Sequence, residues 1–403
     1  MKKTKYIFVG MTSGFGPLAQ IIPIVNELKK NGYKIICFIE RNGKNILTNM
    51  GIEILDFPEI PLPDNVYPSG PEWWNLDYFW GKYGFNDYSY LELLIQTFSA
   101  EIEKYKPELI ISVLHPPAAI LARKFGVPLV CVTQSCMHKN GKGGRTTWWK
   151  ELPDVPLTAS ANVNRILEEM GLEKIEKMED LNEGDLTIVP SIPEFDVIDQ
   201  KNLFYTGPML WEGCNEIPEE EYKIERKNPY LIYTYTGYLQ RSHGKASGLM
   251  VLENIVHAFK NTEFDVIVSI GVGETIPPEI PLVDNIRIVE WVPVSKVIPH
   301  CDLTLHHGGH GSCMQSLVNG VPSIVIPTSD EREYNARQMS ELGVGVYFVP
   351  EEITPQLLLQ GARELVRDEK IKNSAKSWSE KIHSRKYNGA VLAAQAIMDL
   401  MKA

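Results

Sequence analysis

The sequence predicts an α/β protein with two domains, each built on a doubly wound parallel sheet. Short runs that are apolar throughout alternate with stretches of helical periodicity, which is typical of parallel strands covered by helices on both faces. The chain has 403 residues. Because that is more than one hydrophobic core usually serves, we expect two domains of about 200 residues each.

The strands of the two halves can be placed from their apolar runs. In the first half we expect strands at Tyr6–Val9, Lys34–Ile39, Ile52–Phe57, Leu109–Val113 and Leu129–Thr133. In the second half we expect them at Tyr230–Tyr235, Phe264–Ser269, Ile286–Val289, Leu303–Leu305, Ser323–Ile326 and Gly345–Phe348. The helices with the clearest periodicity are Ile21–Leu28, Pro116–Phe125 and Leu249–Phe259, and only helices are expected after Thr354. The proline-rich stretch from Pro190 to Pro229 predicts an interdomain linker.

The composition restricts the class of protein. The formal net charge is −11, and no run of Lys and Arg stands out, so a nucleic-acid surface is not expected. The six cysteines are scattered without a CxxC pair, which favours free thiols in a reducing cytoplasm. The apolar run after the N-terminal lysines is too short for a signal peptide, and no run of about 18 apolar residues predicts a membrane span.

Two long segments carry an unusual density of aromatic residues. Pro58 to Asp87 includes Trp74 and Phe79, and Gln134 to Pro156 includes Trp148. Long segments of this kind inside a compact domain are usually functional or disordered, and the aromatic content argues against disorder. Two interpretations stay open: the rings pack on their own domain, or they form a wall for a flat or apolar ligand.

The most informative motif runs from His306 to Ser312 and reads HHGGHGS, between an apolar strand and a helical stripe. Glycines allow a ligand to approach the backbone closely, and a helix start offers N–H groups that suit a phosphate. A metal site of His300, His306, His307 and His310 is the first alternative, but adjacent histidines on a strand point in opposite directions. A purely structural glycine turn is the second, and a Walker A loop is excluded because the motif has no GxxxxGK[ST] pattern.

A longer pattern surrounds this motif: Glu290-Trp291-Val292-Pro293, His307-Gly308-Gly309, Gly311-Ser312, Gly320-Val321-Pro322, Pro327, Asp330 and Asn335-Ala336. It resembles the donor signature of family 1 glycosyltransferases, and in particular of bacterial members that glycosylate macrolides and other natural products. The resemblance implies the GT-B fold, with two Rossmann-like domains facing an interdomain cleft. It implies domains at 1–210 and 211–385 and a terminal helix, 386–403, that crosses back onto the first domain.

The resemblance also assigns roles to residues of the second half. Trp291 would stack on the nucleotide base and Val292 would offer its backbone, while His307 and Gly309 would lie at the diphosphate. The diphosphate would also contact Thr236, Gly237, Gly311, Ser312 and Cys313. Gln315 stands where a glutamate usually holds the ribose, and Asp330 and Glu331 stand where an Asp–Gln pair usually reads the sugar hydroxyls.

The first half departs from the family pattern. Pro17 takes the place of the histidine that usually deprotonates the acceptor, and Ser112 takes the place of its supporting aspartate. His115, at the expected end of a strand, is the candidate replacement base, because imidazole has a suitable unperturbed pKa; the alternative is a loop histidine without a catalytic role. The residues expected to contact the acceptor are Phe15, Pro17, Trp74, Phe79 and Trp148.

The resemblance thus implies an inverting transferase that moves a sugar from a UDP- or TDP-sugar to a small aromatic or apolar acceptor. It needs no metal and no further cofactor, acts in the cytoplasm, and is a monomer or homodimer. Three alternatives stay open. One is a non-catalytic partner protein that binds nucleotide sugars, and another is an epimerase of the nucleotide sugar. The third is an NAD(P)-binding oxidoreductase, suggested by the spacing of Gly14, Gly16 and Ala19 with Glu40.

Overall fold

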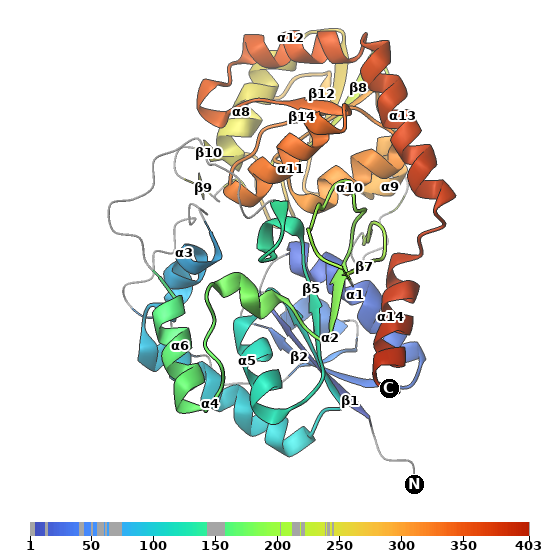
Figure 1. Cartoon of the computed structure of the whole chain (residues 1–403). Coiled ribbons are helices and arrows are strands. Elements are labelled where there is room, and N and C mark those ends of the chain that lie inside the picture. The colour runs from blue at the N-terminus through green and yellow to red at the C-terminus, as the bar shows by residue number, and fades with distance from the viewer. Residues whose placement is uncertain are drawn as a thin grey trace. The chain divides into compact units, whose positions relative to one another are not determined.

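Two parallel sheets, one in each of two structural units, carry the fold of the computed structural model (Figure 1). Unit 1 consists of Met1–Pro68, Trp73–Cys214 and Tyr387–Ala403, and unit 2 consists of Ser69–Glu72 and Asn215–Lys386. The structure describes residues 5–12, 15–39, 44–49, 51–54, 60, 63, 75–142, 158–201, 203–211, 218, 222–237, 239, 242–243 and 246–402.

The sheet of unit 1 has the strand order β3-β2-β1-β4-β5-β6-β7, and all neighbouring strands are parallel. Its strands are β1 (Tyr6–Met11), β2 (Lys34–Ile39), β3 (Glu53–Ile54), β4 (Leu109–Val113), β5 (Leu129–Val132), β6 (Leu186–Val189) and β7 (Leu203–Tyr205). The chain first builds outward from β1 to β3 and then returns to the other side of β1 with β4. The order therefore reverses between β1 and β4, which makes that pair the switch point of the sheet.

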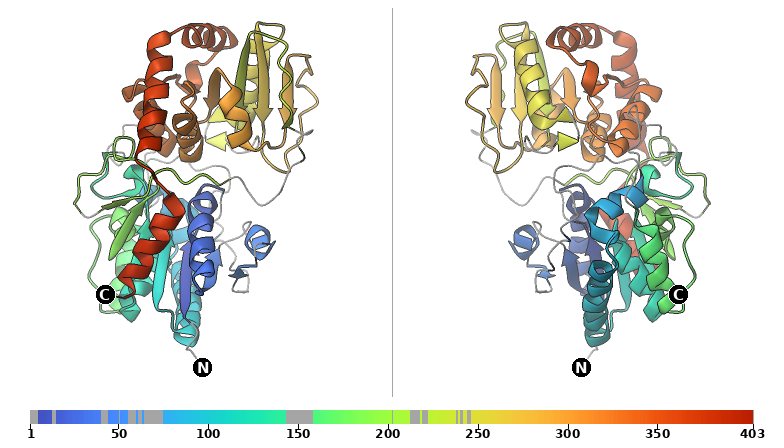
Figure 2. Two further views of the ribbon diagram at one scale, coloured as in Figure 1. Left: turned by 90° about the vertical axis from the view of Figure 1, so that its right-hand side faces the viewer. Right: turned by 90° about the vertical axis from the view of Figure 1, so that its left-hand side faces the viewer.

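Helices cover both faces of this sheet, as the two side views show (Figure 2). They are α1 (Phe15–Lys30), α2 (Lys44–Asn49), α3 (Leu76–Trp80), the π-helix η2 (Gly81–Phe85), α4 (Tyr88–Tyr105), α5 (Pro116–Phe125), α6 (Ser160–Glu169), α14 (Gly389–Leu400) and the 3-10 turns η3 (Ser135–Met137) and η5 (Met178–Asn182). Alternate residues of β1 face opposite cores: Phe8 packs with α4 and α5, and Ile7 and Val9 pack with α1. This alternation explains why the strands are apolar at every position.

The terminal helix α14 belongs to unit 1, where it packs against α1. Its small residues Ala393 and Ala394 are fully buried, and Ile397 joins the same core cluster as Ile21 of α1. The chain re-enters unit 1 where Gly207, with φ +78°, faces Tyr387. A Cβ at position 207 would lie 2.2 Å from that ring, so this crossing requires glycine.

The sheet of unit 2 has the strand order β12-β11-β8-β13-β14-β15 and is also parallel throughout. Its strands are β8 (Tyr230–Tyr235), β11 (Phe264–Ser269), β12 (Ile286–Val289), β13 (Leu303–His306), β14 (Ser323–Val325) and β15 (Gly345–Tyr347); β9 (Ser242–His243) and β10 (Ala246–Ser247) form a separate antiparallel pair. The order reverses between β8 and β13. This is the arrangement of a doubly wound nucleotide-binding sheet.

The helices of unit 2 also lie on both faces of its sheet. They are α8 (Gly248–Phe259), α9 (Val294–Val297), α10 (His310–Asn319), α11 (Asp330–Glu341), α12 (Pro355–Leu365), α13 (Glu369–Ser384) and the 3-10 turns η6 (Ile298–His300) and η7 (Pro350–Glu352). Helices α8 and α12 contact one another and share one core cluster with β8 and β13. On the opposite face, α9 and η6 share the second cluster with β8 and β11.

The fold class and the two parallel sheets predicted from the sequence are confirmed, but the predicted linker is partly wrong. The stretch from Pro190 to Pro229 contains β7, which pairs with β6 and completes the sheet of unit 1. Strand β7 has only three residues, all partly exposed, so no hydrophobic period marks it in the sequence. In the part of the chain that the structure describes, no helix is long and apolar enough to cross a membrane.

Candidate functional site

The switch point of unit 2 brings two loops together at the carboxyl ends of β8 and β13. The strands are neighbours in register, with Tyr235 opposite His306. Thr236 and Gly237 follow β8, and the glycine turn follows β13. In doubly wound sheets ligands bind at this edge, beside the point where the strand order reverses. The motif singled out in the sequence therefore lies where the topology favours a ligand.

Helix α10 starts directly after the glycine turn and presents its N-terminus at this edge. Gly309 is the N-cap residue and, as a glycine, has no side chain that could cap the helix. The N–H of Cys313 donates to the carbonyl of Gly309, at 3.1 Å. The N–H groups of Gly311 and Ser312 thus have no carbonyl partner within the helix. Together with the helix dipole they can bind an anion.

His307 closes one side of this helix start. Its Nδ1 lies 3.5 Å from the carbonyl oxygen of Tyr235, and the two rings meet edge to face with centroids 5.0 Å apart. Gly309 lies directly against the imidazole, because a Cβ there would be 2.9 Å from Nε2. A Cβ on Gly237, which has φ +79°, would be 3.8 Å from the same ring. The two loops therefore converge on His307.

Gly311 differs from its neighbours in the turn. A Cβ added there meets no atom within 4 Å, so the fold itself does not require glycine at this position. A small residue beside unpaired helix N–H groups leaves room for a ligand to contact the backbone. Ser312, one residue on, is partly exposed, and its hydroxyl is close to the same helix start.

Cys313 does not offer its side chain to this edge. The thiol is fully buried, and its N–H is used by the Gly309 carbonyl at 3.1 Å. The expected contact of Cys313 with a diphosphate is therefore not supported by the structure, because both polar groups face inward. Thr236 is similar: it is 2% exposed, and its hydroxyl donates to the carbonyl of Gly237 at 2.8 Å. The side chain of Thr236 shapes the loop instead of facing a ligand.

Gln315 lies one turn along α10, and its side chain is 7% exposed. Among the described residues, no group donates a hydrogen bond to its buried Oε1. A buried carbonyl oxygen without a donor is costly, so a donor from a ligand or a water would stabilise it. The resemblance places the side chain of Gln315 on a ribose.

Helix α11 contributes the residues expected to read the sugar. It begins at Asp330, and Glu331 follows, partly exposed, with its Oε1 accepting a hydrogen bond from Asn335 at 2.8 Å. The side chain of Asp330 lies outside the described part of the structure. At the far edge of the sheet, Trp291 follows β12 and is partly exposed, whereas the side chain of Val292 is 1% exposed and packs in the core. Only the backbone of Val292 is thus available to a ligand.

In unit 1 His115 is completely buried at the carboxyl end of β4. It caps α5: its Nδ1 accepts a hydrogen bond from the N–H of Ala118 at 3.2 Å. Burial lowers the pKa of His115 to about 3, so the ring is neutral near pH 7 and a weak base. The hydroxyl of Ser112 donates to the backbone carbonyl of His115 at 3.1 Å and accepts from its N–H at 3.3 Å. This geometry favours the alternative interpretation, in which His115 is structural.

The structure describes two of the other candidate acceptor residues, Pro17 and Phe79. Pro17 is the third residue of α1 and is partly exposed. Proline is most common at the first residue of a helix, but anywhere in the first turn its missing N–H leaves no intrahelical hydrogen bond unmade. Phe79 is 7% exposed and packs in the core with Trp80 and Tyr83. For Phe79 the structure favours the interpretation in which the rings pack on their own domain. Trp74, Trp148 and the side chain of Phe15 lie outside the described residues.

The sequence did not reveal what His306 does. Its Nδ1 accepts a hydrogen bond from the N–H of Gly308 at 3.2 Å, and burial lowers the pKa of the ring to about 3. The two adjacent histidines therefore differ in position: His307, 5% exposed, lies where the two loops meet, and His306, 2% exposed, lies beneath the turn. The signal was present, since adjacent strand residues point in opposite directions. Among the described residues, no group of three or more His, Cys, Asp or Glu side chains could hold a metal ion.

Comparisons with known proteins find a family match in the part of the chain that contains this site. Residues 253–394 match the family described as erythromycin biosynthesis protein CIII-like, C-terminal domain. A demethyllactenocin mycarosyltransferase of Streptomyces fradiae is 30% identical over 146 residues, which cover 36% of this chain and 31% of the relative. An NDP-glycosyltransferase, YjiC, of Bacillus subtilis (strain 168) is 35% identical over 151 residues, which cover 36% and 37%. The matched part thus spans about a third of these curated relatives.

Solved structures extend the likeness to the whole fold. The glycosyltransferase of kitacinnamycin has a TM-score of 0.72 and 17% identity, covering 98% of this chain and 99% of that one. The calicheamicin glycosyltransferase CalG4 has a TM-score of 0.71 and 18% identity, covering 98% of each. The fold is therefore GT-B. By sequence, the chain is similar over about a third of its length to the mycarosyltransferase and the NDP-glycosyltransferase, and residues 253–394 are similar to the erythromycin biosynthesis protein CIII-like C-terminal domain.

Proposed function

We propose that this protein transfers a sugar from a nucleoside diphosphate sugar to a small natural-product acceptor. The observation that carries the proposal is the uncapped N-terminus of α10 beside His307, at the switch point of unit 2. A diphosphate placed there would receive hydrogen bonds from the N–H groups of Gly311 and Ser312 and from the His307 ring. The family match, residues 253–394, includes His307 and α10, and the mycarosyltransferase and NDP-glycosyltransferase relatives also support the proposal.

The chemistry that this site supports is an inverting displacement without a metal. The acceptor oxygen attacks the anomeric carbon, and the bond to the diphosphate oxygen breaks as negative charge grows on the leaving group. Helix N–H groups and an imidazole that already point at this charge lower the barrier, because they are fixed before the reaction. Trp291 and Gln315 would hold the nucleoside, and Asp330 and Glu331 the sugar, while unit 1 would bind the acceptor near Pro17.

Removal of the acceptor proton is the step for which this chain departs from its family. Pro17 carries no acid–base group, and His115 is buried with a pKa of about 3. We propose that the acceptor hydroxyl is acidic enough to react largely as its anion. Turnover with phenols of graded acidity tests this: the rate should follow the ionised fraction of each phenol as pH is raised. A rate that stays independent of phenol ionisation would show that the chain supplies a base.

Incubation with UDP- and TDP-sugars and a panel of phenols, macrolides, amines and carboxylic acids tests the activity itself. The proposal predicts release of the nucleoside diphosphate together with a new glycoside, at a rate that a metal chelator does not change. Tight binding of the donor without release on any acceptor would support a second function, a non-catalytic nucleotide-sugar-binding partner. The replacement of the usual catalytic histidine by Pro17 is the observation that keeps this second function open.

A further inference from the structure

Asn335 is a buried amide on α11 that joins two parts of the candidate donor site. Its side chain is fully buried. The amide Nδ2 donates to the carbonyl oxygen of Gly308 at 2.9 Å and to Oε1 of Glu331 at 2.8 Å. Gly308 belongs to the turn before α10, and Glu331 lies in the first turn of α11. One side chain therefore contacts both the phosphate-facing turn and the residue expected at the sugar.

Gly308 is held from three sides. Its N–H donates to Nδ1 of His306 at 3.2 Å, and its carbonyl accepts from Asn335. Its φ is +86°, and a Cβ would lie 2.9 Å from the backbone carbonyl oxygen of Arg332. The N–H, the carbonyl and the Cα of Gly308 are thus all fixed by neighbouring residues. The path of the turn determines where the N–H groups of Gly311 and Ser312 point.

The glycine turn and α11 come from different parts of the chain, and Asn335 is a short buried connection between them. The Gly308 carbonyl and Asn335 are 27 positions apart in the sequence, whereas Glu331 is four positions away on the same helix. An amide can serve both acceptors because it carries two N–H hydrogens. An aspartate of the same shape has none, and its charge would face the Glu331 carboxylate and a carbonyl oxygen.

We propose that Asn335 is a positioning residue that couples the diphosphate end of the donor site to its sugar end. Through Gly308 it sets the helix start that binds the diphosphate, and through Glu331 it sets the carboxylate that binds the sugar. This inference rests on the proposed function, because it concerns the donor of that reaction. It predicts that loss of the Asn335 amide weakens both ends of the site, although Asn335 touches neither the diphosphate nor the sugar.

The first test is equilibrium binding of UDP and thymidine diphosphate to the full chain, before and after Asn335→Asp. We expect Kd to rise by about tenfold or more, because an unsatisfied buried carbonyl and a displaced turn remove hydrogen bonds to charged groups. Asn254→Asp is the matched control: the Asn254 amide also donates to a backbone carbonyl, that of Met250 at 2.9 Å, but on α8. The control variant should bind both nucleotides as the unaltered chain does.

The second test separates the two ends of the site. UDP and UDP-glucose are titrated into the unaltered chain, Glu331→Ala, Asn335→Ala and the double variant. Glu331→Ala should weaken the binding of UDP-glucose but not that of UDP. Asn335→Ala should weaken the binding of both. The double variant should lose less binding free energy for UDP-glucose than the sum of the two single losses. The reason is that Glu331 is already misplaced when Asn335 is absent. Additive effects would overturn the coupling, and unchanged UDP binding in Asn335→Ala would overturn the positioning role.

Amide hydrogen exchange distinguishes a local change in the turn from unfolding of the variant. In Asn335→Ala without nucleotide, exchange should speed up at residues 308–312 while the amides of β8 and β11 stay protected. Faster exchange throughout unit 2, or unchanged exchange in the turn, would count against a local role. If the unaltered chain binds neither UDP nor thymidine diphosphate, the proposed function fails. If it binds them and Asn335→Asp binds equally well, only the present inference fails.

Discussion

At the scale of single residues, two of the buried imidazoles, those of His115 and His306, accept backbone hydrogen bonds in the same way in different units. Each is enclosed, each is neutral because burial lowers its pKa to about 3, and each accepts a backbone N–H through Nδ1. His115 caps α5 and His306 holds the glycine turn. Sequence alone separates such histidines from catalytic ones poorly, because burial and the partner of each ring nitrogen are set by tertiary packing.

Replacement of His115 by Gln distinguishes its two interpretations. We expect turnover per folded molecule, at saturating donor, to stay within about twofold, since a weak buried base contributes little proton transfer. Stability should fall by about 1 kcal/mol or more, because the cap of α5 is lost. Turnover and urea unfolding of the same preparation measure both. A fall in turnover of about a hundredfold without loss of stability would instead identify His115 as the base.

Phe79 offers a second prediction at this scale. Because the ring is buried beside Trp80 and Tyr83, Phe79→Ala should destabilise unit 1 by about 3–5 kcal/mol. The conservative Phe79→Leu should cost less and leave KM for the acceptor unchanged. Chemical denaturation and acceptor kinetics provide the two readings. If Phe79→Leu has near-normal stability but a raised KM for the acceptor, then the ring of Phe79 contacts the acceptor.

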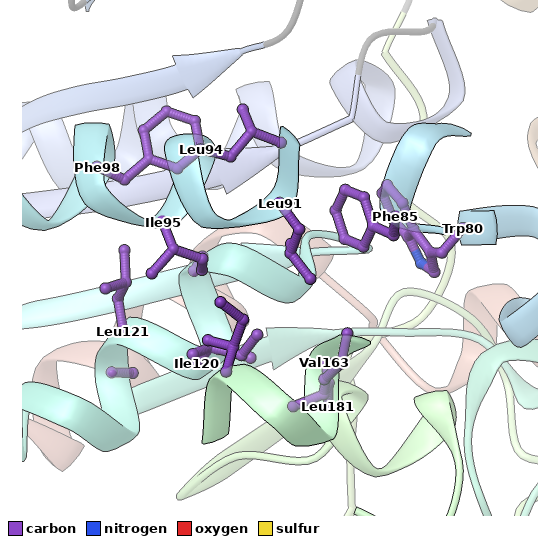
Figure 3. Close-up of a cluster of buried hydrophobic side chains, with 14 of the residues drawn as sticks. Trp80, Phe85, Leu91, Leu94, Ile95, Phe98, Ile120, Leu121, Val163 and Leu181 are labelled. Carbon is purple, nitrogen blue, oxygen red and sulfur yellow. The ribbon is translucent and has the colours of Figure 1, made fainter. Parts of the chain in front are cut away.

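At the scale of elements, the hydrophobic pattern identified most strands and the main helices closely. Strands β2, β4, β8, β11 and β12 and helix α5 have the predicted bounds. The short strands β6 and β7 were not predicted. Two aromatic residues before α4 follow the first of the two interpretations: Trp80 and Phe85 stack with centroids 4.7 Å apart and fill the core beside Leu91 and Ile120 (Figure 3).

The candidate site was predicted as a motif, but its construction was not. The turn after β13 and the start of α10 follow from the strand, the glycines and the helical stripe. The contacts of Gly308 with Asn335 and Arg332 join residues far apart in the sequence. Such contacts depend on how α11 packs, which no local pattern specifies. The sequence did not predict that the side chains of Cys313 and Thr236 are buried, for the same reason.

Two alanine substitutions in the turn should have opposite effects on stability. Gly311→Ala should keep or raise the stability of unit 2, by up to about 1 kcal/mol, because its Cβ meets open space and alanine favours the helix. It should nevertheless weaken nucleotide binding, since the methyl group would occupy the space beside the helix N–H groups. Gly309→Ala should lower stability, because its Cβ would lie 2.9 Å from the His307 ring.

Thermal unfolding and a UDP titration of both variants check these effects. The two measurements are independent, so stability and binding can be separated within each variant. If Gly311→Ala binds UDP as tightly as the unaltered chain, then the ligand does not approach the backbone at this helix start.

At the scale of the whole molecule, the buried histidines predict how stability depends on pH. The native rings of His115 and His306 have a pKa of about 3, below the ordinary value of 6.5. The unfolded chain therefore binds protons that the native chain does not as pH falls below about 6.5, and stability is lost in that direction. Each ring should contribute a slope of about 1.4 kcal/mol per pH unit once well below this value.

Urea unfolding between pH 7.5 and 5 measures this slope before most carboxylates titrate. His306→Asn should reduce the slope relative to the unaltered chain. A stability that stays constant or increases toward pH 5 would show that these histidines take up protons in the folded protein.

The two units also differ in how far their function follows from known relatives. The family match, residues 253–394, covers most of unit 2 and the start of α14. The likeness to the solved structures is one of fold, at 17–18% identity. In unit 1, that Pro17 and Ser112 take the places of the usual histidine and aspartate stays a prediction. The donor site is consequently the better-supported half of the proposed reaction.

Calorimetric titration of UDP and thymidine diphosphate into the unaltered chain and into His307→Ala, with a chelator present, tests that central claim most directly. The account predicts saturable binding to one site per chain without metal, and a Kd raised by about tenfold or more in His307→Ala, because one charge-assisted hydrogen bond to the diphosphate is lost. Absence of binding by the unaltered chain, or equal affinity in His307→Ala, would contradict it.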